Sequence, residues 1–366
     1  MDSSADQAPG AFVPTPNALA NLKGYAMNRR SILLVTSMLL TFLQPGVAHA
    51  ADELRLMVHS SFSLPTPVLD MFEAKFKTKV IIVKGGDAGE MLNKLILTRA
   101  NPIADVVYGL DNTLVAKALA NHVLEPVLPQ MFRLPDEQLG SALAPVDFGF
   151  ITINVDKAEV AKRGVPLPTR LSDLTLPAYK GWLVLPNPAT SSTGYGFLLA
   201  TISGLGEEPA FAWWAQMRAN GLKVVKGWSE AYYTEFSRNK GAYPLVVSYA
   251  TSPAAEVFYS KEKVTESPTA SLNLKGGVFR QVEGVGLIKG GGQRELALKF
   301  VTFMRTGPVQ EALQTAMWMY PVIAKVDRVE VMQYAPIPRE FESLSPQVIA
   351  AKGSDWVARW TQVVLK

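Results

Sequence analysis

The sequence predicts an α/β fold with two lobes, each a mostly parallel sheet flanked by helices, joined by two crossover strands. Three observations support this prediction. The chain has 366 residues, 48% of them apolar and 19% charged, which suffices for two lobes with hydrophobic cores. Short apolar runs alternate with amphipathic segments, as in βαβ units. Two longer extended stretches, 144–156 and 278–292, lack a helical period and could each cross between the lobes.

The first lobe begins with a βαβαβ pattern. The run 54–58 alternates apolar with other residues, and the β-branched run 80–83 suits a buried parallel strand. Such units form mostly parallel sheets with right-handed connections between the strands, and they bind ligands at the carboxyl ends of the strands. We predict strands at 54–58, 80–83 and 104–111, helices at 67–76 and 90–97, and the return of two C-terminal helices, 294–304 and 307–317, to this lobe.

The second lobe repeats the alternation with different turns. We predict strands at 182–187, 222–225 and 244–250, and helices at 196–205, 209–217 and from Ser229 onward. Two crossings of the chain would leave a cleft with a hinge at its back. The predicted domains are residues 51–146 plus 282–366 for lobe 1 and residues 147–281 for lobe 2.

The N-terminal region has the layout of an export signal. Residues 27–50 combine a short basic region, an apolar run and a small-x-small ending at Ala50, which predicts a cleaved signal peptide and a periplasmic protein. Residues 1–26 are interpreted as a non-native or misannotated extension. The Arg29-Arg30 pair leaves twin-arginine export open, although the following residues favour general secretion.

Composition excludes several classes of function. Residues 1–50 carry three basic and two acidic side chains, so the rest of the chain has 33 basic and 30 acidic residues, and it has no basic run. This balance argues against nucleic-acid binding. The absence of Cys rules out thiol nucleophiles and thiolate metal sites, and only His59 and His122 remain for a hydrolytic triad without a G-x-S-x-G elbow. We therefore expect neither an enzyme nor a bound cofactor or metal.

Polar residues follow the predicted strands at one edge of the sheet. His59 and Ser60 come after the first strand, Asp87 after the second and Asp111 after the third. Ser191 precedes a predicted helix, where free N–H groups could hold a phosphate or a hydroxyl, although an ordinary N-cap explains the same residue. Together these residues predict a ligand site at that edge.

Aromatic residues from separate segments point to the same cleft. Trp228, Tyr232 and Phe236 have the i, i+4, i+8 spacing of a helix that packs into a core, an interpretation that suits Phe236 best. Trp228 follows a predicted strand and so lies at the cleft edge, as does Tyr249, while Trp318 lies in a loop. A rim of such rings suits a flat cation, at about 0.5–2 kcal/mol per ring.

Several motifs in the same order make the chain similar to a known family. They extend over most of the chain from about residue 54, and it resembles the periplasmic thiamine-binding proteins of ABC importers, which belong to the type II solute-binding proteins. The motifs are GLDN, PVDFGF, VKGWSEAY, LVVSYATSPA and WMYPV.

The resemblance implies a fold, a ligand and partners. It implies the periplasmic-binding-protein type II fold, a monomer that binds thiamine or a thiamine phosphate, and delivery to an ABC permease with its ATPase. By motif, Asp87 is the acid that holds the cation, Ser191 binds the hydroxyethyl or phosphate end, and Trp228, Tyr249 and Trp318 supply the rings. Tyr232 lines or supports this wall.

Departures from the family keep alternatives open. The family's Tyr-Asp-Ser-Phe is replaced here by His59-Ser60-Ser61-Phe62, and Ala255 stands where the family often has Tyr. The ligand could therefore be a thiamine precursor, a phosphorylated form or another heteroaromatic cation. The adjacent Tyr232 and Tyr233 leave a ferric-ion carrier as an alternative, a polyamine carrier is another, and an exported enzyme acting on a pyrimidine is the third.

Overall fold

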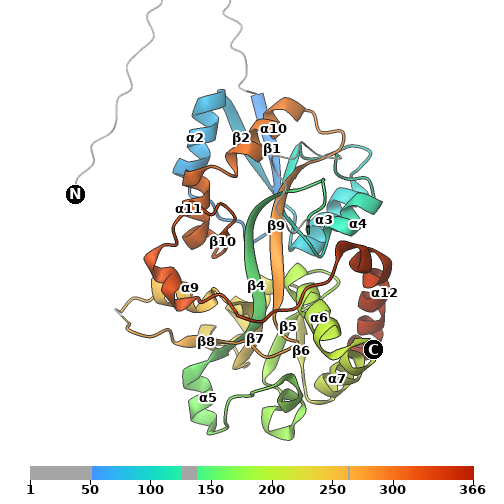
Figure 1. Cartoon of the computed structure of the whole chain (residues 1–366), viewed down its shortest axis with the longest axis vertical. Coiled ribbons are helices and arrows are strands. Elements are labelled where there is room, and N and C mark those ends of the chain that lie inside the picture. Colours follow the sequence, from blue (N-terminus) through green and yellow to red (C-terminus); the bar gives the residue numbers. More distant parts are fainter. Residues whose placement is uncertain (1–51, 126–137, 263) are drawn as a thin grey trace, which may run out of the picture. The chain divides into compact units, whose positions relative to one another are not determined.

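The computed structural model describes residues 52–125, 138–262 and 264–366. The predicted extension (1–26) and signal peptide (27–50) lie outside the described residues. The described residues belong to one compact unit, in which helices flank a continuous sheet (Figure 1). None of the helices in the described ranges has both the length and the apolar character that a membrane span requires.

The first lobe is the predicted βαβαβ unit. Strand β1 (Asp52–Val58) pairs in parallel with β2 (Thr78–Lys84) on one side and β3 (Val106–Asp111) on the other. The helices α2 (Thr66–Phe76) and α3 (Ala88–Leu97) connect them. The carboxyl ends of the three strands therefore meet at one edge, as predicted.

One detail of the first lobe was predicted wrongly. Strand β2 is parallel, but it lies at the edge of the sheet rather than inside it, and Ile81 is 41% exposed. The return of the C-terminal helices is confirmed, because α10 (Arg294–Phe303) and α11 (Gly307–Ala316) share a hydrophobic core with β1 and α2. In that core the ring of Phe300 meets Phe72 edge-on, with centroids 5.0 Å apart.

The second lobe also has parallel strands. Strand β5 (Leu183–Pro186) lies between β6 (Lys223–Val225) and β7 (Leu245–Tyr249) and is parallel to both. Its helices α6 (Ser192–Leu205) and α7 (Glu207–Ala219) follow β5 in the chain. Trp214 on α7 donates to Thr201 on α6 at 3.0 Å, so the two helices are held together by a buried hydrogen bond as well as by packing.

Two antiparallel strands join the lobes, as predicted. Strand β4 (Ala144–Asp156) pairs with β9 (Phe279–Leu287) over most of the length of both. Strand β9 also pairs with β3 of the first lobe, and β4 with β7 of the second. Figure 1 shows β4 and β9 running side by side from one lobe to the other. The described strands thus form one ten-stranded sheet, with the main order β2-β1-β3-β9-β4-β7-β5-β6.

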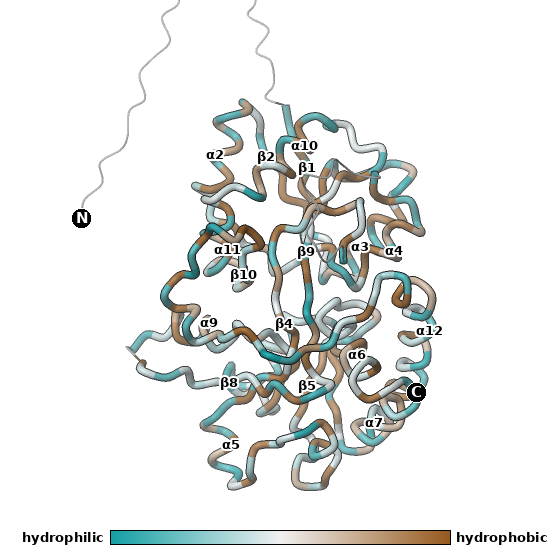
Figure 2. Tube along the Cα trace, viewed as in Figure 1, coloured by the Kyte–Doolittle hydropathy of each residue, from teal (hydrophilic) through white to brown (hydrophobic). Residues whose placement is uncertain are grey.

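The C-terminal helix α12 (Pro346–Leu365) was not anticipated. Along such outer helices the colour in Figure 2 alternates between hydrophilic and hydrophobic, as a half-buried helix requires. Trp360 packs edge-on against Trp214 at 5.7 Å, and Gly353 leaves room for the hydroxyl of Tyr195. Because α12 contacts α7 of the second lobe and also α4 (Val115–Ala120), the exact lobe boundaries stay a prediction.

The remaining elements are short. They complete the surface around the lobes and the edge of the cavity described below. They are α5 (Lys157–Arg163), α8 (Trp228–Glu230), the π-helix η4 (Ala231–Glu235), α9 (Ser252–Phe258), β8 (Thr269–Leu272), β10 (Tyr320–Pro321), and the 3₁₀ turns η2 (Leu171–Thr175), η3 (Pro177–Tyr179), η5 (Ser237–Asn239) and η6 (Glu330–Tyr334).

Candidate functional site

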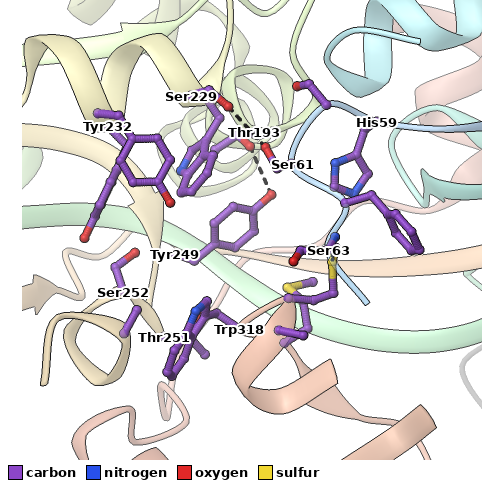
Figure 3. A pocket seen from close by; sticks show the side chains of 18 of the residues that line it. His59, Ser61, Ser63, Thr193, Ser229, Tyr232, Tyr249, Thr251, Ser252 and Trp318 are labelled. Carbon is purple, nitrogen blue, oxygen red and sulfur yellow. Dashed lines mark hydrogen bonds between the residues drawn. The ribbon is translucent and has the colours of Figure 1, made fainter. Parts of the chain in front are cut away.

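A cavity of about 850 Å³ is lined by residues of both lobes. This volume is in the range of sites for small organic ligands. Its lining comes from the carboxyl ends of the first-lobe strands, from the start of α6, from α8 and α9, and from the loop before β10. Figure 3 shows Tyr249 in the middle of this lining, between Tyr232 and His59, with Trp318 below.

The structure brings most of the predicted site residues to this cavity. Seven of the eight predicted residues line the cavity. They include Trp228 and Trp318, which come from distant segments of the chain. Ser191 does not line it: the residue is the N-cap of α6 and only 1% exposed. The next residues, Ser192 and Thr193, line it instead. The seven are His59, Ser60, Asp87, Trp228, Tyr232, Tyr249 and Trp318.

The second lobe supplies an aromatic wall. The rings of Trp228 and Tyr232 stack with centroids 5.3 Å apart and an angle of 21°. The indole of Trp228 donates to Ser248 Oγ at 2.8 Å, and the hydroxyl of Tyr232 donates to Glu256 Oε1 at 2.8 Å. The rings are carried by α8 and the π-helix η4, a conformation that often marks functional sites. Both rings are therefore fixed in orientation before any ligand arrives.

Two further rings line the cavity, that of Tyr249 beside this wall and that of Trp318 in the loop before β10. Tyr249 meets Trp228 edge-on at 6.3 Å, and its hydroxyl lies 3.0 Å from that of Thr193 (Figure 3). Trp318 has a φ of 57°, a strained backbone for a bulky residue that often accompanies functional sites. Its indole packs edge-on against Phe258 and Tyr259 of the α9 region, at 5.4 and 5.8 Å.

Phe236 does not belong to the wall. Its side chain is fully buried and packs with Val184, Val225 and Val246 in a small core, where its ring lies behind that of Tyr232, with centroids 5.5 Å apart. The prediction that Phe236 is a core residue is therefore confirmed. The stretch 226–236 thus has two functions, because its first turns face the cavity and its last residue faces the interior.

Asp87 ties the two lobes together. Its Oδ1 accepts from Ala88 N at 2.7 Å at the start of α3, and its Oδ2 accepts from Trp228 N at 2.9 Å in the other lobe. A Cβ on residue 227 would lie 2.9 Å from Oδ2, so Gly227 permits this close approach. Burial raises the pKa of Asp87, while these N–H groups and the neighbouring Ser191 act in the opposite direction. Both oxygens are thus already engaged by the protein.

Other contacts lie along the same seam between the lobes. Lys226 Nζ is 2.7 Å from Glu90 Oε1, and Glu90 N donates to Thr190 O at 3.2 Å. The hydroxyls of Ser61 and Ser229 lie 3.3 Å apart (Figure 3). The lobes are therefore in direct contact beside the cavity, as in a closed binding protein.

Sequence reasoning missed Glu283, which lines the cavity from β9. Its side chain is 6% exposed, and its Oε2 lies 3.9 Å from His59 Nε2. Neither of these two buried atoms has a hydrogen-bond partner among the described residues. The sequence did contain a signal for it, namely a single acidic residue within the apolar stretch 278–287. A charge in a buried strand is costly unless it has a partner, so such a residue indicates a functional role.

Burial and mutual repulsion govern the charge of this part of the cavity. Burial raises the pKa of Glu283 well above its ordinary value, and the nearby Asp147 raises it further. Burial raises the pKa of Asp147 to about 7, although Tyr108 donates a hydrogen bond to it. The pKa of His59 is lowered to about 4 by burial and by Lys84, so this imidazole is neutral at pH 7.

The tyrosine pair is poorly suited to ferric iron. Iron-binding tyrosines act as tyrosinates, but burial raises the pKa of Tyr232 well above 10 and also raises that of Tyr233. Tyr232 moreover donates its hydroxyl proton to Glu256. In the described ranges, no group of three or more His, Asp or Glu side chains has the spacing to hold a metal ion.

Comparisons with known proteins find similar chains. The thiamine-binding periplasmic protein of Salmonella typhimurium is 31% identical, over 89% of this chain and 97% of that protein. That of Escherichia coli is 30% identical, over 86% of this chain and 94% of that protein. A solved structure of a periplasmic thiamin binding protein superposes with a TM-score of 0.77 at 30% identity, covering 87% of this chain and 98% of that one.

More distant structures share the fold alone. A ferric binding protein from Campylobacter jejuni superposes with a TM-score of 0.66 at 18% identity, covering 85% of this chain and 99% of that one. The predicted type II fold is thereby confirmed. The profile of the family described as "Bacterial extracellular solute-binding protein" matches residues 101–344, more than half of the chain. The chain therefore belongs to the bacterial extracellular solute-binding protein family.

Proposed function

We propose that the protein is the periplasmic solute-binding component of an ABC importer and that it binds thiamine or a thiamine phosphate without catalysing a reaction. One observation carries the proposal: aromatic rings from three distant segments line a single cavity together with a buried carboxylate. Rings of this kind bind a flat cation by their faces. The similarity to thiamine-binding periplasmic proteins supports the same ligand.

The two ends of the ligand would meet different surfaces. The heteroaromatic rings would lie against Trp228 and Tyr249, with Trp318 closing the opposite side. The hydroxyethyl or phosphate end would face Ser192 and Thr193, which line the cavity at the N-terminus of α6, where backbone N–H groups favour an anion. The two lobes would close over the ligand, and the protein, as a monomer, would deliver it to the permease and its ATPase.

The number of unpaired carboxylates favours thiamine over a polyamine. Three acidic residues line the cavity, and a polyamine would need several of them. Glu256 is occupied by Arg238 at 2.9 Å and by Tyr232, and Asp87 accepts two backbone N–H groups. Glu283 therefore stands as the one cavity carboxylate in the described residues with an unpartnered buried oxygen. A single counter-charge matches a ligand with one permanent positive charge.

Catalysis has little support among the residues of the cavity. Several hydroxyl groups line it, but a Ser nucleophile needs an adjacent base. His59 Nε2 is hydrogen-bonded to no described residue, and the hydroxyls of Ser248 and Ser252 bond to each other at 2.9 Å. The matched relatives are binding proteins, in line with this argument.

Calorimetric titration of the purified protein tests the proposal. The ligands are thiamine, its mono- and diphosphate, the pyrimidine half alone, spermidine and ferric citrate. We expect thiamine or one of its phosphates to bind with at least tenfold higher affinity than the others, together with quenching of tryptophan fluorescence. Tighter binding of spermidine, or a visible charge-transfer band with iron that Tyr233→Phe abolishes, would contradict it.

A further inference from the structure

We propose that Glu283 is the counter-charge that recognises the positive charge of the ligand, and that its carboxyl group releases a proton to solvent when the ligand binds. This inference rests on the proposed function, because it assigns the charge of a thiamine-like cation to one residue. It differs from the expectation drawn from sequence, in which Asp87 holds that charge.

The position of Glu283 makes it available to a ligand. The residue lies on β9, one of the two crossover strands, and lines the cavity at the point where first-lobe and second-lobe residues meet. Its Oε2 is buried without a partner, and the facing His59 Nε2, 3.9 Å away, is likewise unpartnered. Unpaired buried polar atoms are costly, so this unpaired pair, on two residues that line the cavity, points to a ligand that supplies the missing partner.

The competing carboxylates are already satisfied within the protein. Asp87 accepts from the N–H groups of Ala88 and Trp228, as described above. Asp111 accepts from Thr113 N at 2.9 Å, from Thr113 Oγ1 at 2.6 Å and from Gln281 Nε2. A carboxylate with several donors gains less from an additional cation than one with a free oxygen.

The described groups that act on Glu283 are acidic side chains and phenols from several elements. Asp147 of β4 is coupled to it, Asp111 of β3 and Asp87 before α3 repel it, and the phenols of Tyr108 on β3 and Tyr249 on β7 lie nearby without ionising. His59 Nε2 lies 3.9 Å from Glu283 Oε2, and burial together with the charge of Lys84 lowers the pKa of His59 to about 4, which leaves it neutral. The groups that interact with Glu283 are Asp147, Asp111, Asp87, Tyr108, Tyr249 and His59.

A proton on this carboxyl group follows from these neighbours. In the empty cavity, Asp147 and Glu283 cannot both be ionised without strong repulsion in a water-poor site, so the pair keeps a proton near neutral pH. A permanent positive charge next to Glu283 stabilises the ionised carboxylate, so the carboxyl group loses its proton to water and buffer. The thiazolium charge does not titrate, so the released proton comes from the protein.

The linkage fixes the sign of the pH dependence. Because the ligand prefers the ionised carboxylate, affinity rises with pH while the empty site is still protonated, by at most about tenfold per pH unit for one proton. Affinity becomes constant above the pKa of the empty site. His59 contributes nothing between pH 6 and 8, because it stays neutral throughout this range.

Calorimetry in buffers of different ionisation enthalpy tests the inference. At pH 7 we expect thiamine to release a measurable fraction of one proton from the wild-type protein, and affinity to rise between pH 6 and 8. Glu283→Gln should release no proton and bind thiamine at least about tenfold more weakly at pH 8. A neutral thiamine analogue, with carbon in place of the charged ring nitrogen, should release no proton from the wild type and should bind Glu283→Gln as well as it binds the wild type.

Two controls separate charge recognition from misfolding. Glu295→Gln makes the same change at an exposed position on α10 that does not line the cavity, and should leave proton release and affinity unchanged. Asp147→Asn alters the partner but not the proposed contact. It should reduce proton release while retaining or improving thiamine affinity at pH 6, because Glu283 is then ionised more easily.

The outcomes distinguish this inference from the proposed function. If thiamine binds without proton release, or if Glu283→Gln binds it as tightly as the wild type, the inference is overturned and the proposed function stands. If thiamine does not bind at all, the proposed function fails, and carbon-13 NMR titration of the empty protein decides on Glu283. A carboxyl group still protonated at pH 7 would support its charge-sensing role, whereas one already ionised at pH 7 would overturn it.

Discussion

The two sides of the cavity are built differently. The second-lobe side carries stacked and edge-on rings, among them Trp228, Tyr232 and Tyr249, whose polar atoms bond to their own lobe. The first-lobe side carries small polar residues, such as Ser60 and Ser61, and the carboxylate of Asp87. One lobe thus provides a preformed surface for a flat ligand, and the other provides contacts that form when the lobes close.

Because of this difference, the second-lobe side should govern recognition of the ligand, and the contacts between the lobes should govern closure. A rigid wall binds without losing much conformational freedom, so its rings should contribute to affinity in either arrangement of the lobes. The seam contacts exist only while the lobes touch, so they should act on the closed population. Substitutions on the two sides are therefore expected to differ in size and in kind.

The largest effect is expected in the wall. Trp228→Ala should weaken thiamine binding by about 2 kcal/mol, or roughly 30-fold, because a ring face and the stacking partner of Tyr232 are lost. Phe236→Ala should instead lower the free energy of unfolding by about 3–5 kcal/mol and leave affinity nearly unchanged. Titration and thermal unfolding of both variants check this contrast, and equal losses of affinity would contradict it.

A smaller effect is expected at the seam. Asp87→Asn keeps the size of the side chain but replaces one carboxylate oxygen by an amide N–H₂ group. That group faces an N–H donor, either Ala88 N or Trp228 N, so one of the two hydrogen bonds is lost. We expect affinity to fall by about 1.4 kcal/mol, or tenfold, through a smaller closed population. Small-angle scattering with saturating thiamine should then show a larger radius than for the wild type. An unchanged radius and affinity would show that this bond does not control closure.

The stability of the empty protein should depend on pH through the buried acids. The native state keeps a proton on Asp147 up to its pKa of about 7, whereas the unfolded carboxyl group has lost its proton above about pH 4. This contribution to stability is therefore lost as pH rises through 7, and the last of it disappears between pH 6.5 and 8.5. Stability therefore falls as pH rises, by about 1 kcal/mol or roughly 2–4 °C in Tm. His59 opposes this trend near the lower end of that range, because the unfolded imidazole, with its ordinary pKa of about 6.5, is partly protonated there while the native imidazole is neutral.

Thermal unfolding of variants tests the origin of this trend. Asp147→Asn and Glu283→Gln should each flatten the dependence of Tm on pH, since each removes one member of the coupled pair. An unaltered slope in both variants would assign the effect to other groups.

The smallest effect is expected at the exposed end of the seam. Lys226 and Glu90 form an ion pair of 2.7 Å, but the lysine side chain is 68% exposed. Such pairs contribute about 0–1 kcal/mol and are screened by salt. Lys226→Met should thus weaken binding by less than about threefold at low salt and not measurably at 0.5 M NaCl. A larger loss that persists in salt would place this contact among the main determinants of closure.

Much of the fold was readable from local pattern. Strand β4 coincides with the predicted extended stretch 144–156, because an apolar stretch of that length without helical period cannot form an amphipathic helix. Helix α12 was missed although its signals are present: Ser345 and Pro346 begin it, and Trp356 and Trp360 share one face. Burial of β2 was predicted wrongly, because hydrophobicity does not reveal which parallel strand lies at the edge.

The site was less readable, for a physical reason. Strand ends and ring-bearing segments could be located because the topology brings them to one edge. The burial and the partners of a single side chain could not be predicted: Ser191 is buried and does not line the cavity, and Asp87 is engaged by backbone N–H groups of both lobes. The free oxygen of Glu283 depends on where Asp147 and His59 lie in space, which no local pattern records.

A structure of the protein with thiamine tests the central claim most directly. We expect the thiazolium ring beside Glu283 and within about 6 Å of the rings of Trp228 or Tyr249, with Trp318 on its other side. It also predicts that the contacts across the seam persist. Thiamine bound elsewhere on the surface, or a cavity that stays empty at saturating thiamine, would contradict it.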